Sequence, residues 1–286
     1  MKNRKTIVLL VSLMIFLSAI TALTGILSND ERGLKQMTSV NGQPVELYGK
    51  GIYHNMSADV AVQGIAQDYV TVFIGIPMLI LGLSMSRKNA LRGRLFLAGI
   101  VGYFLVTFLF YTVMGMYNEC FLLYAALMGL SFFTLSTILF GVDLRTIKDQ
   151  FDSRTPTRGA GIFLLINAAM IALMWLQVVV PPLLDGSLYP KELQHYTTLI
   201  VQGMDLGLLL PLCVVSAVLF MRKKDVGYLT APVYLAFLSL LMTALLAKII
   251  GMSMIGVEAG PALIIIPIIL CFTCLFTWLT YRKIEG

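Results

Sequence analysis

Four polar side chains stand inside long apolar stretches of this chain, and they are the first candidates for chemistry. They are Asp68, Gln202, Asp205 and Lys248. An ionisable group inside a bilayer costs about 2.5–3.5 kcal/mol to insert, so it usually faces a cavity or a partner. We therefore predict that the four line a substrate-binding site. The alternative is that each carboxylate is only stabilised near the N-terminus of its helix, where the helix dipole favours an anion.

The depth of these groups in the membrane follows from where their helices begin and end. If the helix carrying Asp205 begins at Thr197 or Thr198, both natural N-caps, Asp205 lies about 10 Å along it. Lys248 lies at a similar depth in an outward-running helix, eight residues before Gly256. An Asp205–Lys248 ion pair is the hypothesis; alternatively, the long lysine stem carries its ammonium group to the outer interface.

The chain has only two histidines, His54 and His195, and both stand just ahead of an apolar stretch. They are predicted metal ligands if the fold brings them together, for a metal ion or a haem. Metal sites normally need three or four ligands, and the carboxylates nearby in sequence are Glu46, Asp59 and Glu192. The alternative is a pair of interfacial side chains in an aromatic belt. The sequence identifies no cofactor.

The elements that must position these residues are membrane helices. Hydrophobic residues make up 58% of the 286 and charged residues 13%, about half the charged fraction of a soluble domain. About 20 apolar residues cross a bilayer as a helix, and the fold class is therefore an all-α integral membrane protein of eight transmembrane helices. The predicted spans are Thr6–Leu27, Tyr69–Ser86 (with a helix start near Ser57), Leu95–Met116, Cys120–Gly141, Gly159–Val180, Leu199–Met221, Tyr228–Met252 and Pro261–Tyr281.

The lysines and arginines between these spans are distributed very unevenly. Sixteen lie in one alternating set of segments, which includes both termini, and four lie in the opposite set. Cytoplasmic loops carry the excess of basic residues. The sequence therefore predicts a plasma (cytoplasmic) membrane protein with cytoplasmic N- and C-termini. The net charge of +6 is explained by these segments and does not indicate nucleic acid as a partner.

An internal repeat organises the spans. Leu47-Tyr48-x-Lys50-x-x-x-His54 recurs as Leu188-Tyr189-x-Lys191-x-x-x-His195, and Val-Gln-Gly followed by Asp comes after each copy. Further pairs follow in order: Pro77 and Pro211, Arg87 and Arg222, Gly115-Met116 and Gly251-Met252, Phe132 and Phe272, Leu135 and Leu275, Thr137 and Thr277.

The repeat predicts two four-helix units, residues 1–149 and 150–286. Because four is even, both units have the same orientation, which is the parallel type of transporter repeat. Pro77 and Pro211 are predicted to kink matched helices. The repeat places Thr112 where the second unit has Lys248, so Asp68 lacks a basic partner of its own and the two units are chemically unequal.

The function that these features favour is a small transporter or permease, with its polar site between the repeats in the outer half of the membrane. The alternative is a non-catalytic membrane subunit or sensor that binds a protein partner or a metal through its outer loops. An intramembrane enzyme or haem-binding redox protein is the weakest reading, because both histidines lie outside the spans. No Walker, HExxH or GxSxG motif occurs, and an enzyme is therefore not expected.

Overall fold

The computed structural model describes residues 3–87, 90–257, 260 and 262–284. Within them, eight helices are long and apolar enough to cross a membrane, as predicted. Their bounds are α1 Arg4–Leu27, α2 to α3 Ala58–Arg87, α4 Leu91–Val113, α5 Phe121–Phe140, α6 Thr157–Val179 with the short α7 Pro181–Leu184, α8 to α9 Ile200–Met221, α10 Asp225–Met254, and α11 Ala262–Tyr281.

Two helix starts differ from the expected ones. The second span begins at Ala58 instead of Tyr69, so much of the expected long loop is helical, with Ser57 as its N-cap. The sixth begins at Ile200 instead of Thr197 or Thr198, which brings Asp205 nearer to its helix N-terminus. The start expected for the last span, Pro261, lies outside the described residues.

Both helices that carry the aspartates change their winding partway along. In the second span, α2 (Ala58–Val70) passes through a π-helical segment, η2 (Thr71–Gly75), into α3 (Ile76–Arg87). A π segment is rare and often marks a functional site. Pro77 follows directly as the second residue of α3, so the wider turn precedes the residue that cannot donate a backbone hydrogen bond.

The sixth span repeats this arrangement. There α8 (Ile200–Met204) passes through the π-helical η5 (Asp205–Leu209) into α9 (Leu210–Met221), and Pro211 is the second residue of α9. The two π segments and the two prolines are each separated by 134 residues. The helices therefore share a local irregularity that hydropathy does not reveal.

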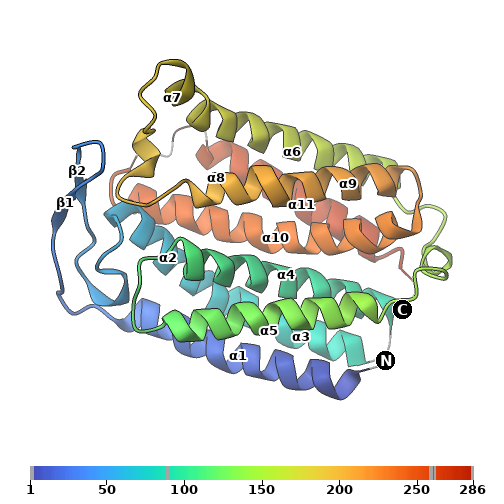
Figure 1. Cartoon of the computed structure of the whole chain (residues 1–286). Helices are drawn as coiled ribbons and strands as arrows, with labels where there is room; N and C mark the ends of the chain where they lie inside the picture. The colour runs from blue at the N-terminus through green and yellow to red at the C-terminus, as the bar shows by residue number, and fades with distance from the viewer. Residues whose placement is uncertain (1–2, 88–89, 258–259, 261, 285–286) are drawn as a thin grey trace.

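The central helix of the bundle is α10, which contacts α2 and α4 on one side and α9 and α11 on the other (Figure 1). Its crossing with α4 is tight at Gly99. A Cβ at Gly99 would lie 2.6 Å from the carbonyl oxygen of Val233 and 2.5 Å from the Cβ of Ala236. Close backbone approach at a small residue is how membrane helices gain contact area, and here it joins the first four spans to the last four.

The two ends of the bundle differ. The start of α1 and the end of α11 lie at one end, which we call the terminal end (Figure 1). The opposite, hairpin end carries an antiparallel pair of strands, β1 (Gln36–Thr38) and β2 (Pro44–Glu46). Short turns complete the ends: η1 (Gly51–Tyr53), η3 (Lys148–Gln150) and η4 (Lys191–Leu193).

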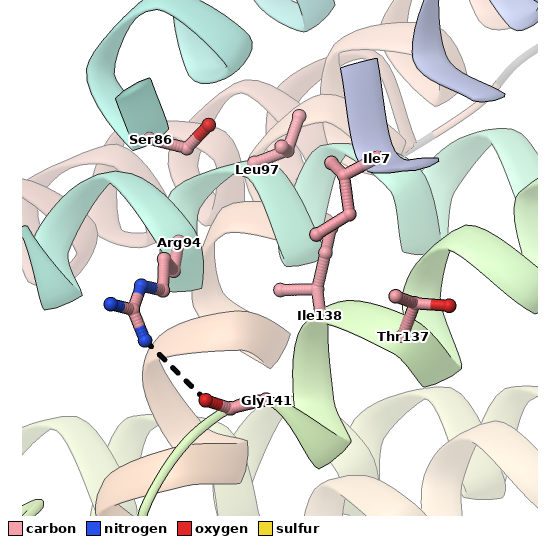
Figure 2. A pocket seen from close by; sticks show the side chains of 7 residues that line it. All are labelled: Ile7, Ser86, Arg94, Leu97, Thr137, Ile138 and Gly141. Carbon is pink, nitrogen blue, oxygen red and sulfur yellow. Dashed lines mark hydrogen bonds between the residues drawn. The ribbon is translucent and has the colours of Figure 1, made fainter. Parts of the chain in front are cut away.

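A small void lies between α1, α4 and α5. Figure 2 shows its lining: Ile7, Ser86, Arg94, Leu97, Thr137, Ile138 and Gly141. Arg94 spans it and donates a hydrogen bond from Nη1 to the carbonyl oxygen of Gly141 at 3.4 Å. The volume, about 10 Å³, is close to what one water molecule occupies. This void is too small to hold a substrate.

Candidate functional site

Asp68 is fully buried and held by two tyrosines. Tyr53, from the turn η1, donates to one carboxylate oxygen at 2.6 Å, and Tyr111, from α4, donates to the other at 3.0 Å. Only 1% of the Asp68 surface is exposed. A buried carboxylate is tolerated when its oxygens accept hydrogen bonds. Asp68, predicted to lack a basic partner, is therefore satisfied by neutral donors.

Gly25 of α1 makes room for this carboxylate. A Cβ added at Gly25 would overlap a carboxylate oxygen of Asp68 and lie 2.9 Å from the Tyr53 hydroxyl. Three separate segments, α1, η1 and α4, therefore converge on one side chain of α2. Neither Gly25 nor the two tyrosines could be assigned to Asp68 from sequence spacing, because the contacts join elements 15 to 43 residues apart in the chain.

A second polar group lies beside Asp68. The side-chain amide of Gln67 donates to the hydroxyls of Tyr103 and Thr107, the latter at 3.1 Å. Both partners belong to α4, and all three side chains are buried. The contact of α2 with α4 is thus fixed by two adjacent polar groups.

Asp205 has a different environment. It is half-buried and opens the π segment η5, and the indole Nε1 of Trp175, on α6, donates to one carboxylate oxygen at 2.7 Å. Gln202 lies one turn earlier, on α8, and is also half-buried. In the described part of the chain the Gln202 side chain makes no hydrogen bond, so its amide is available to a ligand.

Lys248, on α10, lies within electrostatic range of both Asp68 and Asp205. In the described residues, however, no nitrogen–oxygen contact within 4.0 Å joins Lys248 to a carboxylate. The direct Asp205–Lys248 ion pair expected from depth alone is therefore not formed. In its place, one ammonium group lies near two carboxylates, one from each group of four spans.

The two histidines bind separate backbone carbonyls. His54 contacts the carbonyl oxygen of Gly51 through Nδ1 at 2.8 Å, and His195 contacts that of Asn55 through Nε2 at 3.0 Å. The ring of His195 also packs on Tyr196, with centroids 4.5 Å apart. Nowhere in residues 3–87, 90–257, 260 and 262–284 do three His, Cys, Asp or Glu side chains gather as metal ligands. The predicted metal role gains no support from these contacts.

His195 instead belongs to a seam that joins the two halves at the hairpin end. Its neighbour Gln194 donates to both carboxylate oxygens of Asp59 at 3.1 Å. On the other side, the hydroxyl of Tyr196 contacts the backbone nitrogen and the hydroxyl of Ser57 at 3.3 and 3.4 Å. Three consecutive residues before the sixth span thus cap the start of the second.

Beside this seam lies a large open cleft of about 1120 Å³. Its walls come from the hairpin, the start of α2, the end of α6 with α7, the segment between α7 and η4, and the end of α10. The sequence gave no sign of it, because the cleft depends on how five separate segments meet. Comparison of the chain with known protein families, with curated proteins and with solved structures found no match.

Proposed function

We propose that the chain is a small secondary transporter, built from two parallel four-helix repeats in a plasma membrane, with both termini in the cytoplasm. The sixteen basic residues on one side against four on the other support this orientation. They place the terminal end in the cytoplasm and the hairpin end outside. Asp68, Gln202, Asp205 and Lys248 form the transport site.

Local geometry supports the duplication. Gly93 lies two residues into α4, and a Cβ there would be 2.4 Å from the backbone of Met85 in α3. Gly227 lies two residues into α10, and a Cβ there would be 2.3 Å from the backbone of Leu219 in α9. The two glycines are separated by 134 residues, the same interval as the two prolines and the two π segments.

This interval changes which residues correspond. At 134 residues, Asp205 is the counterpart of Thr71, and Gln202 is the counterpart of Asp68. The two acids are therefore offset by three residues, about 4.5 Å along a helix. The two halves would present their carboxylates at different depths, although the halves themselves are alike.

The observation that carries the proposal is the position of Lys248. It projects from the helix that contacts both halves and interacts with the carboxylate of each. Intramembrane ionisable groups of this kind mark ion and substrate pathways. We infer that an ion or a charged substrate competes for one carboxylate and shifts the ammonium group towards the other.

Alternating access would then proceed around the α4–α10 crossing. The close contact at Gly99 acts as the pivot, because backbone-to-backbone packing resists sliding. The π segments η2 and η5 lie in the helices that carry the acids, so either helix can rewind locally when its carboxylate binds or releases a cation.

A test that needs no known substrate is two-sided thiol labelling at Gln202. Gln202→Cys is made in a protein whose four native cysteines are replaced by alanine. A membrane-impermeant thiol reagent is applied to intact cells and, separately, to inside-out vesicles. Alternating access predicts labelling from both sides, because each state opens the site to one of them.

Two control variants define what the labelling means. Val215→Cys, on the exposed apolar face of α9, should stay unlabelled because it faces lipid, and Glu46→Cys, on β2, should react from the outside only. Labelling of Gln202→Cys from one side alone, or from neither, in a variant that melts like its parent would rule out the transporter.

The outer cleft favours the alternative function, a membrane subunit or sensor that binds a partner outside. Such a protein needs the cleft but not access to Gln202 from the cytoplasm. The same labelling experiment therefore separates the two functions.

A further inference from the structure

The walls of the outer cleft carry a strong excess of negative charge. Four carboxylates line it, Glu46, Asp59, Asp185 and Glu192, against a single basic residue, Lys191. Asp185 accepts a hydrogen bond from the backbone N–H of Ser187 at 2.8 Å. This bond, with help from the Ser187 hydroxyl, lowers the pKa of Asp185 below its ordinary value. Its carboxylate is therefore charged at neutral pH, and the cleft attracts cations.

These carboxylates do not form a metal site. No group of three or more potential ligands converges anywhere in the part of the chain that the structure describes, whereas Ca²⁺ takes six to eight oxygens. The charges are instead distributed along walls that come from the hairpin, α2 and the segment after α7. A ligand that matches them must carry its positive charges apart from one another.

Apolar side chains lie between the charged ones. Val45, Pro181, Pro182, Ile255 and Val257 belong to the same lining. Short hydrocarbon segments gain free energy by leaving water at such surfaces, at about 25 cal/mol per Å². The cleft therefore offers alternating anionic and apolar contacts over a length that exceeds one small ion.

One acceptor in the wall is unused. The amide nitrogen of Gln194 is engaged by Asp59, while its Oε1 is buried without a hydrogen-bond partner in the described residues. A buried acceptor left without a donor costs about 1–3 kcal/mol. A ligand N–H that reaches Gln194 would recover that free energy, so the wall calls for a donor and not for a further acceptor.

We propose that the outer cleft binds an extended ligand with two or more ammonium groups separated by short apolar segments. Two sources share this chemistry: a free polyamine and a lysine-rich peptide segment. The inference goes beyond the proposed function, because binding at the cleft requires no transport. It holds equally for a transporter that collects its substrate there and for a sensor.

Isothermal titration calorimetry on the full chain tests the proposal. The protein is placed in nanodiscs of phosphatidylcholine, which carries no net charge, and is titrated with spermidine and with trilysine. Trialanine and triglutamate serve as uncharged and anionic controls. Both polycations should bind, and raising the salt concentration should weaken binding because exposed charges are screened within about 10 Å at 0.1 M. The tighter of the two polycations identifies the source.

Variants locate the binding. The triple variant E46Q/D185N/E192Q keeps the size of each side chain and the acceptor for Ser187, so it should fold normally while binding weakens by about tenfold or more. Glu31→Gln, an exposed outer carboxylate outside the lining, should leave binding unchanged. Absence of binding by both polycations, or equal binding by the triple variant, would overturn the proposal. Neither result depends on whether Gln202 is reached from the cytoplasm.

Discussion

At Asp68, the shape of one glycine decides whether a membrane helix can hold a carboxylate. Gly25 leaves the space that Asp68 and the Tyr53 hydroxyl occupy together. An added methyl group must displace the carboxylate from at least one of its two tyrosine donors. The buried oxygens would then lack a hydrogen bond, in a region where water cannot replace it.

We therefore expect Gly25→Ala to destabilise the protein by about 1–3 kcal/mol, through overpacking and the lost hydrogen bond. The midpoint of thermal unfolding in detergent measures it. Gly129→Ala is the matched control, because Gly129 is also in a membrane helix and a Cβ there would meet nothing within 4 Å. Equal midpoints for the two variants would contradict this account of Asp68.

At the residue scale the sequence identified the ionisable groups but not their partners. Asp68, Asp205 and Lys248 stand out because charge is rare in apolar runs. Trp175 and Tyr111 do not stand out, because aromatic residues are common in such runs. The direct Asp205–Lys248 pair was wrong because equal depth along two helices does not fix the distance between their side chains.

At the scale of elements, two glycines allow the turns between consecutive spans to close. Gly93 and Gly227 each bring the start of a helix against the backbone that ends the preceding one, with ideal Cβ distances of 2.4 and 2.3 Å to backbone carbons. Backbone atoms cannot move aside as a flexible side chain can. Each turn therefore depends on the absence of a side chain.

Gly93→Ala and Gly227→Ala should each destabilise the protein by about 1–3 kcal/mol, and to a similar extent, if the turns are duplicated structures. Gly102→Ala, in α4, should be tolerated, because the nearest atom to its Cβ is a side-chain carbon of Phe237 at 3.9 Å. Thermal unfolding in detergent compares the three. A cost at one turn and none at the other would weaken the case for duplication.

The number of spans and most of their bounds were predictable, because about 20 apolar residues are needed to cross a bilayer. The π segments were not, since hydropathy is insensitive to whether a turn holds one extra residue. The start of the second span at Ala58 was also missed as an apolar boundary. Residues 58–68 include Asp59, Gln63, Gln67 and Asp68, and at least three of these side chains hydrogen-bond to residues from other segments.

At the scale of the whole molecule, the linker between the halves is fastened to the C-terminal segment. Lys283 donates to the carboxylate of Asp152 at 2.9 Å, and Phe151 pairs as a β-bridge with Ile284. The backbone N–H of Arg154 and then Lys283 lower the pKa of Asp152 to about 2. We call these contacts the terminal clasp.

The clasp should respond to acid in a defined direction. Because the folded pKa of Asp152 is below its ordinary value of 3.8, its contribution to stability is present above about pH 4 and is lost as the pH falls towards 2. Asp152→Asn should lower the melting midpoint at pH 7, and the difference from the parent should shrink below pH 4. A difference that stays constant down to pH 3 would contradict this.

The arrangement of the halves around α10 and the outer cleft could not be derived from the sequence. The seam that Gln194, His195 and Tyr196 form with Asn55–Asp59 joins residues about 140 positions apart. Such contacts leave no periodicity in either segment. His54 and His195, predicted as ligands from their matched places, are explained by separate carbonyl contacts.

The central claim is that one cation, Lys248, serves carboxylates from both halves. Double-mutant cycles test it directly, with Asp68→Asn, Asp205→Asn and Lys248→Met made singly and in the two pairs that include Lys248. The free energy of unfolding in detergent is measured for each. The account predicts a coupling of about 0.5–2 kcal/mol between Lys248 and each aspartate. Coupling to Asp205 alone, or to neither, would contradict it.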